Sequence, residues 1–254
     1  MTGSPSRIKA EIWIVLGLSL GLSSLYSIVS IWRRLLREEA LNEQTATINR
    51  PLAEEEFFDL IYQVLGIVSG LVPVALVLFL LADTTRPRFH RLGLDATRPG
   101  RDLLWSVGLA AVIGVPGLAL YAAGLALGLT VQVVPSALNA TWWTIPILLL
   151  QALKAGLVEE IIAVGYLFAR LRDLRIAPWV IVILQALLRA TYHLYQGVGP
   201  FVGNFIMGVV FGWWYLRTQR LAPLIGAHAL IDAVAFVGYP VAVEAAPEFF
   251  GITP

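Results

Sequence analysis

Seven ionisable side chains lie inside apolar segments, and all seven are in three segments in the second half of this 254-residue chain. They are Lys154, Glu159 and Glu160 in segment 142–169, Arg189 and His193 in segment 177–195, and His228 and Asp232 in segment 222–241. A charged group at the centre of a bilayer costs about 2.5–3.5 kcal/mol on insertion scales, so it needs a partner, a water-filled cavity or a function. The clustering favours a functional site over a polar plug that only fixes helix register.

The spacing of these residues is suited to a common cavity. Arg189 and His193 are four positions apart, as are His228 and Asp232, so each pair lies on one face of an α-helix. The two adjacent glutamates diverge by about 100°, so only one of them can point straight into the cavity. With neutral histidines, Lys154 and Arg189 nearly balance the three carboxylates, as a buried polar site requires.

Two carboxylates and two imidazoles are a set that can activate water. A glutamate would act as the general base, and the histidines would hold the water or stabilise an oxyanion. The same set is also suited to a metal ion or to a proton relay. The chain has no cysteine, which excludes disulfides, thiolate metal ligands and cysteine nucleophiles.

The composition indicates that lipid is the main solvent of this protein. Hydrophobic residues make up 58% of the chain and charged residues 14%, with a mean hydropathy of +0.77, whereas soluble domains carry about 25% charged residues. A net charge of +1 without a basic face argues against nucleic-acid binding. Because irregular backbone is costly in lipid, we expect an all-α polytopic transmembrane helical bundle.

Seven windows are long and apolar enough to be transmembrane helices of about 20 residues. They cover residues 11–32, 57–82, 103–127, 142–169, 177–195, 201–216 and 222–241. The first window is too long for a signal peptide and is expected to be retained. One window is short and one is long, so the expected number of spans is about seven, within six to eight.

The loops between these windows predict the orientation of the chain. Arginines follow the second, fourth and sixth windows: Arg86, Arg88, Arg91, Arg98, Arg101, Arg170, Arg172, Arg175, Arg217 and Arg220. The positive-inside rule places these loops and the N-terminus in the cytoplasm. Stretches 128–141 and 196–201 carry no charge and the tail carries Glu244 and Glu248, which fits the opposite side. Loop 33–56 fits less well, since it has four arginines among glutamates, and is predicted to be an amphipathic or solvated connector.

The polar segments resemble the three-motif signature of the CPBP family of intramembrane proteases, which includes type II CAAX prenyl proteases, bacteriocin-processing proteins and Abi-type proteins. The resemblance rests on the run EEIIAVGYLF at 159–168, on His193 and on the run HALID at 228–232, with supporting phrases at 215–218 and 221–228. We therefore expect one integral membrane domain over residues 1–254. Within it, residues 142–241 would form a CPBP-like catalytic core, and residues 1–141 would be N-terminal spans of unassigned role.

The resemblance implies a role for each matching residue. Glu159 would be the base that activates water, with Glu160 in a supporting role. His193 and His228 would position the water and stabilise the tetrahedral intermediate, and Asp232 stands where the family has Asn or Asp. The resemblance also implies a glutamate protease that needs no catalytic metal and no other cofactor.

Two positions depart from the family pattern. Val164 stands where the first motif has arginine, and Arg189 stands where the second has phenylalanine. The usual arginine lies one helical turn from Glu160 and can pair with it. We hypothesise that Arg189, one turn from His193, supplies this guanidinium from the other side of the cavity. Counting residues from the cytoplasmic loops places His193 nearer the outer face than the glutamates.

The leading hypothesis is an endopeptidase of a bacterial plasma membrane that cleaves a membrane-associated peptide or protein. A bacterial source is indicated by the excess of arginine over lysine, and bacteria generally lack prenylated CAAX proteins, so a CAAX substrate is not implied. Two alternatives stay open: an inactive membrane scaffold or immunity-type protein that retains the fold, and a proton-coupled carrier. A carrier usually has broken helices in two inverted repeats, whereas the polar residues here lie in one half.

Overall fold

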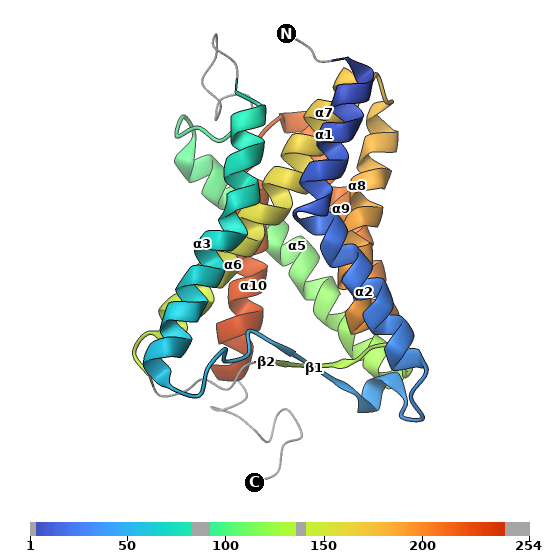
Figure 1. Ribbon diagram of the computed structural model, residues 1–254, viewed down its shortest axis with the longest axis vertical. Coiled ribbons are helices and arrows are strands. Elements are labelled where there is room, and N and C mark those ends of the chain that lie inside the picture. The colour runs from blue at the N-terminus through green and yellow to red at the C-terminus, as the bar shows by residue number, and fades with distance from the viewer. Residues whose placement is uncertain (1–3, 83–91, 136–140, 242–254) are drawn as a thin grey trace.

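The computed structural model describes residues 4–82, 92–135 and 141–241, and it is a bundle of helices (Figure 1). The helices are α1 (Pro5–Gly17), α2 (Leu20–Leu35), α3 (Glu56–Leu80), α5 (Pro99–Ala126), α6 (Thr144–Glu159), α7 (Leu167–Asp173), α8 (Pro178–His193), α9 (Val198–Thr218) and α10 (Ala222–Ala233). Short helices η1 (Leu41–Glu43), η2 (Glu160–Tyr166), η3 (Leu194–Gln196) and η4 (Val234–Gly238), with strands β1 (Thr45–Ile48) and β2 (Gln132–Pro135), complete it. The predicted all-α membrane bundle is confirmed.

Each predicted window coincides with a helix or with consecutive helices. Within the described ranges, four helices are long and apolar enough to cross a membrane: Glu56–Leu80, Pro99–Ala126, Val198–Thr218 and Ala222–Val241. Helices α1 and α2 qualify together as a fifth span with a bend of 54°. Helices α6 and α8 have 16 residues each, and α6 continues through η2 and α7 to Asp173. These two helices and α10 carry the ionisable residues.

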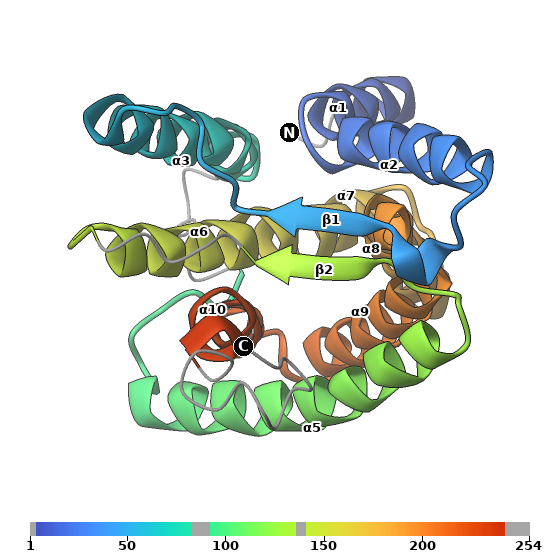
Figure 2. The ribbon, with the colours of Figure 1, turned by 90° about the horizontal axis from the view of Figure 1, so that it is seen from below.

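The bend between α1 and α2 has a local cause. Helix α1 ends at Gly17, and the Ser19 hydroxyl donates to the Val15 carbonyl at 2.6 Å. Such back-bonding by serine competes with the helical hydrogen bonds and bends helices. The bend directs α2 along α8, away from α3 (Figure 2).

The described parts of the loops after the second, fourth and sixth windows, which the charge pattern assigned to the cytoplasmic side, lie at the same end of the bundle. At the first end, the Leu221 amide donates to the Leu92 carbonyl at 3.0 Å, and Arg170 of α7 pairs with Glu11 of α1 at 2.6 Å. At the opposite end, the Val131 amide donates to the Gln196 carbonyl at 2.8 Å. Arg86, Arg88, Arg91, Glu244 and Glu248 lie outside the described residues.

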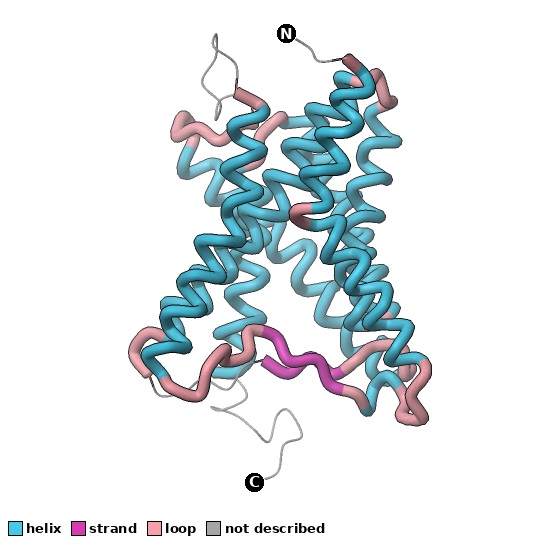
Figure 3. The backbone as a smooth tube through the Cα atoms, viewed as in Figure 1, coloured by secondary structure: helices cyan, strands magenta, loops and turns pink. Residues whose placement is uncertain are grey.

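The connector 33–56 is more ordered than the expected solvated loop. Its strand β1 pairs in parallel with β2, so that Thr45 faces Gln132 across the register, and the pair crosses this end of the bundle (Figure 3). Arg34 is buried and donates to Gln44 Oε1 at 3.4 Å and to the Thr45 carbonyl at 3.1 Å. At least one arginine of this loop therefore has a structural role, which explains part of its misfit to the positive-inside rule.

Glycines allow the site-bearing helices to approach closely. A Cβ atom at Gly208 of α9 would lie 2.6 Å from the Ala186 Cα of α8, and one at Gly156 of α6 would lie 2.9 Å from the Ile225 carbonyl oxygen of α10. Small residues at helix interfaces are typical of membrane bundles, where van der Waals packing drives association. The backbones of α6, α8, α9 and α10 are thereby held close enough for short side chains to meet.

Replacement of Gly208 tests this packing. We expect Gly208→Ala to lower the free energy of unfolding by about 1–3 kcal/mol, because the new methyl group overlaps the α8 backbone. Thermal unfolding in detergent would measure the loss. The control is Gly108→Ala on α5, where an added Cβ meets nothing within 4 Å; equal stability of the two variants would contradict the close contact.

Candidate active site

The two glutamates lie where the helix geometry changes. Glu159 is the last residue of α6, and Glu160 begins the π-helix η2, all seven residues of which are buried. Single π-helical turns within α-helices are frequent at functional sites. Although the two residues are adjacent, both carboxylates reach the same guanidinium on α8, that of Arg189.

Arg189 is the centre of the polar cluster. Its side chain is fully buried, and its Nη2 atom lies 2.6 Å from Glu160 Oε1 while Nη1 lies 3.4 Å from Glu159 Oε2. Nη1 also lies 3.3 Å from His228 Nδ1, and the guanidinium lies over the Phe211 ring at 5.6 Å. The guanidinium therefore takes the position against Glu160 that was hypothesised from the absence of arginine at Val164.

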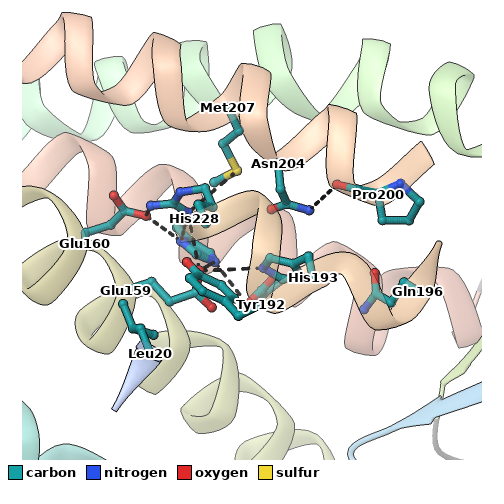
Figure 4. A network of polar contacts seen from close by, with 12 residues as sticks. Leu20, Glu159, Glu160, Tyr192, His193, Gln196, Pro200, Asn204, Met207 and His228 are labelled. Carbon is teal, nitrogen blue, oxygen red and sulfur yellow. Dashed lines mark hydrogen bonds and ion pairs between the residues drawn. The ribbon is translucent and has the colours of Figure 1, made fainter. Parts of the chain in front are cut away.

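The two glutamates differ in their access to solvent. The Glu160 side chain is fully buried and Oε1 also lies 2.6 Å from His228 Nδ1, whereas 13% of the Glu159 side chain is exposed. Glu159 lines a cavity, whereas the Glu160 carboxylate lies beside the His228 ring (Figure 4). Of the two carboxylate residues, Glu159 is therefore the one that lines the cavity.

The histidines flank Glu159 from two other helices. His193 Nε2 and His228 Nε2 lie 3.8 Å and 3.7 Å from Glu159 Oε2, and Asp232 Oδ2 lies 3.6 Å from His228 Nε2. Both ring nitrogens of His193 are shielded, without a hydrogen-bond partner in the described part of the chain. Buried polar atoms of this kind call for a ligand or a functional explanation.

The expected depth of His193 was wrong. Helix α6 continues as η2 and α7 to Asp173, and α8 begins at Pro178, so Glu159 and His193 lie almost equally far along the chain from the turn that joins them. At about 1.5 Å per residue, they reach the same depth. The continuous helix, which the sequence windows cut at residue 169, accounts for the difference.

Tyr192 is a site residue that the sequence reasoning missed. Its hydroxyl donates to Glu159 Oε2 at 2.5 Å, and its ring lies against the His193 ring with centroids 4.8 Å apart (Figure 4). In the sequence, a tyrosine next to the motif histidine is indistinguishable from an aromatic residue that packs in the core, so its role was not predicted. Within the described residues, all of these contacts of Glu159 involve Oε2, which leaves Oε1 for water.

Lys154 lies in the cavity wall but outside the cluster around Arg189. Within the described ranges, its ammonium makes one hydrogen bond, to Gln151 Oε1 at 2.6 Å, and no ion pair. The sequence predicts a supporting role for Lys154, alongside Arg189, in balancing the charge of the three carboxylates. Lys154 lies five residues before Glu159 on the same helix, and both side chains line one cavity.

The cavity has a volume of about 430 Å³ and three walls. One wall is α6, the second is the bend between α1 and α2, and the third is the stretch of α3 from Gly66 to Pro73. Helices α3 and α2 stand apart on the same side of α6 and α8 (Figure 2). The cavity that Glu159 and Tyr192 line therefore lies between these two helices.

No three His, Asp or Glu side chains in the described ranges are arranged to hold a metal ion. The contacts bring together acids, bases and hydrogen-bond donors: Glu159, Glu160, Arg189, Tyr192, His193, His228 and Asp232. This is a set that can deprotonate water and stabilise an oxyanion.

Comparison with known proteins supports the resemblance seen in the sequence. Residues 141–234 match the family model described as type II CAAX prenyl endopeptidase Rce1-like. The segment contains all seven residues of the cluster, and the predicted resemblance to CAAX-type intramembrane proteases is confirmed. Nothing among the curated proteins, and nothing among the solved structures, matches the chain.

The buried ion pair can be tested by a double-mutant cycle on stability. We expect Arg189→Met to lower the free energy of unfolding by about 3–5 kcal/mol, because it leaves the buried Glu160 carboxylate without its guanidinium partner. The double variant Glu160→Gln/Arg189→Met should lose less than Arg189→Met alone. Thermal unfolding in detergent would measure these two variants and Glu160→Gln alone, with exposed Arg33→Met as the control. Strictly additive losses would show that the two groups are not coupled.

Proposed function

We propose that this chain is an intramembrane endopeptidase in which Glu159 activates water to hydrolyse a peptide bond of a membrane-associated substrate. One observation carries the proposal: Glu159 stands at the cavity wall with its carboxylate between a tyrosine hydroxyl, a buried guanidinium and two imidazoles. The match of residues 141–234 to a protease family supports the reaction class.

In the proposed reaction, Glu159 is the general base. Arg189 and the Tyr192 hydroxyl favour its ionised form through Oε2, so Oε1 accepts a proton from water while the water oxygen bonds to the carbonyl carbon. The carbonyl π electrons move to oxygen and form a tetrahedral oxyanion. Glu159 then returns the proton to the leaving nitrogen as the C–N bond breaks.

The histidines serve the oxyanion and the water. His193 has unpaired ring nitrogens beside Glu159, so we assign to it the stabilisation of the oxyanion by N–H donation. His228 lies between Glu160 and Asp232, which orient its ring towards Glu159. Glu160 and Arg189 position the cluster and do not contact the substrate.

The proposed setting follows from the charge pattern and the cavity. We place the chain in a bacterial plasma membrane with its N-terminus in the cytoplasm, following the positive-inside rule. Residues 142–241 would form the catalytic core, and α1, α2 and α3 would shape the access of substrate from the bilayer. A membrane-associated peptide or protein is the substrate class that such access favours.

Removal of the base tests the proposal directly. We expect Glu159→Gln to reduce the rate of cleavage by about 10²- to 10⁴-fold, because the amide cannot accept the proton of water. A library of membrane peptides, incubated with the purified protein in nanodiscs and analysed by mass spectrometry, would supply the substrate. His193→Ala should cause a comparable loss, and a chelator should leave the wild-type rate unchanged.

The matched control is Glu54→Gln, since Glu54 is exposed in the connector before α3. Full activity of Glu159→Gln would refute the assignment of Glu159 as the base. Inhibition by the chelator would show that the reaction needs a metal ion and would refute the metal-independent mechanism. A wild-type chain that binds but cleaves no peptide, with variants equally folded, would favour the inactive scaffold.

Tyr192 provides a second test of the same site. We expect Tyr192→Phe to lower kcat by about 10- to 100-fold, because loss of a hydrogen bond to a charged group weakens the fixed orientation of Glu159. The phenylalanine ring keeps the contact with His193, so the unfolding temperature and KM should change little. An unchanged kcat would remove Tyr192 from the mechanism.

A further inference from the structure

Lys154 is a cation whose surroundings leave it available to a ligand. It lies on the face of α6 that also presents Ala155, Val158 and Glu159 to the cavity. An ammonium group has three N–H donors, and the described contacts of Lys154 use one of them, to Gln151. Intramembrane lysines are costly and call for a partner or a function.

A directional chain of hydrogen bonds holds Lys154 in place. Lys154 donates to Gln151 Oε1 at 2.6 Å, Gln151 Nε2 to Gln63 Oε1 at 3.2 Å, and Gln63 Nε2 to Asp59 Oδ1 at 3.2 Å. Since the ammonium only donates and an ionised carboxylate only accepts, the orientation of both amides is fixed. Asp59 is buried and also accepts from the Leu52 amide at 2.7 Å, so its carboxyl group is held by contacts outside the cavity.

The opposite wall is shaped to receive the lysine side chain. A Cβ atom at Gly70 of α3 would lie 3.1 Å from Lys154 Cδ. The glycine therefore lets the aliphatic part of Lys154 lie against α3 while Lys154 still lines the cavity. A side chain at this position would narrow the cavity.

We propose, building on the protease function above, that Lys154 binds a carboxylate of the substrate and so sets which peptide bond reaches Glu159. The carboxylate would be the C-terminus or an Asp or Glu side chain. Lys154 precedes Glu159 by five residues, an axial separation of about 7.5 Å. An extended peptide covers this distance in about two residues. Because the lysine side chain is long, the bound carboxylate can lie up to about four residues from the cleaved bond.

The depth of Lys154 favours a peptide over a lipid headgroup. Ten residues separate it from Thr144 at the start of α6, which is about 15 Å at the helical rise. That distance is half of a hydrocarbon core of about 30 Å. A phosphate at the membrane surface therefore lies far from the ammonium, whereas a peptide in the cavity brings its carboxylate to it.

The two lysines of the chain, Lys9 and Lys154, make a direct binding test available. Full-length Glu159→Gln protein, with lysine ¹³C-labelled at Cε, would be titrated in phosphatidylcholine nanodiscs with N-acetyl-trileucine and with its C-terminal amide. The Lys9→Met variant assigns the signals, since Lys9 is exposed on α1. We expect the acid, and not the amide, to shift the Lys154 signal. Isothermal titration calorimetry should show that Lys154→Met weakens binding of the acid by at least about tenfold.

A shift of equal size with the amide would overturn the proposal, as would an unchanged affinity in Lys154→Met. The same shift produced by phosphatidylglycerol nanodiscs without peptide would assign the site to lipid and also overturn it. Because Glu159→Gln is used, this binding result does not depend on catalysis, and absence of cleavage by the wild type bears only on the proposed function.

With an active wild type, matched substrates distinguish the two carboxylate sources. A free C-terminus two to four residues from the cleaved bond, its amide, and the amide with an internal Asp at that distance would be compared. We expect an acidic form to have a KM at least about tenfold below that of the plain amide, with similar kcat, and Lys154→Met to abolish this difference while Lys9→Met preserves it. Equal KM values for all three substrates would overturn the proposal.

Discussion

A fully buried guanidinium between two adjacent carboxylates is the constraint around which the C-terminal half is built. Arg189 contacts Glu159, Glu160 and His228, which come from the end of α6, the start of η2 and α10. Removing such charges from water costs several kcal/mol per ion, and only close mutual contact offsets this. Helix α8, the α6–η2 helix and α10 therefore have to meet at the same depth, each rotated so that its polar residues face the guanidinium.

The surrounding packing follows from this requirement. Gly156 brings α10 against α6, and Gly208 brings α9 against α8. The π-helical turn at Glu160–Tyr166 alters the rotation of the chain directly after Glu159, so neighbouring carboxylates approach one guanidinium without a sharp break in the helix. Tyr192, in the last turn of α8, then holds the more exposed glutamate towards the cavity.

The sequence predicted what depends on local pattern. Apolar length located the helices, and four-residue spacing paired His228 with Asp232 on one face. It missed features that arise only when distant segments meet: the parallel pairing of β1 with β2, the burial of Arg34, and the hydrogen bond from Tyr192. The error in the depth of His193 arose because η2 and α7 prolong α6 beyond its apolar window.

The position of the arginine changes what holds the site together. An arginine at position 164 would pair with Glu160 within one helix, four residues away, and the pair would persist if the helices moved apart. With Val164 in η2 and Arg189 in α8, the same charge pair spans two helices. Separation of α8 from η2 would pull the Arg189 guanidinium away from the buried Glu160 carboxylate at a high cost in lipid, so the ion pair opposes it strongly. The contact between α8 and η2 therefore also holds Glu159 in its orientation. A change that loosens this contact should lower the stability of the bundle and disturb the proposed active site together.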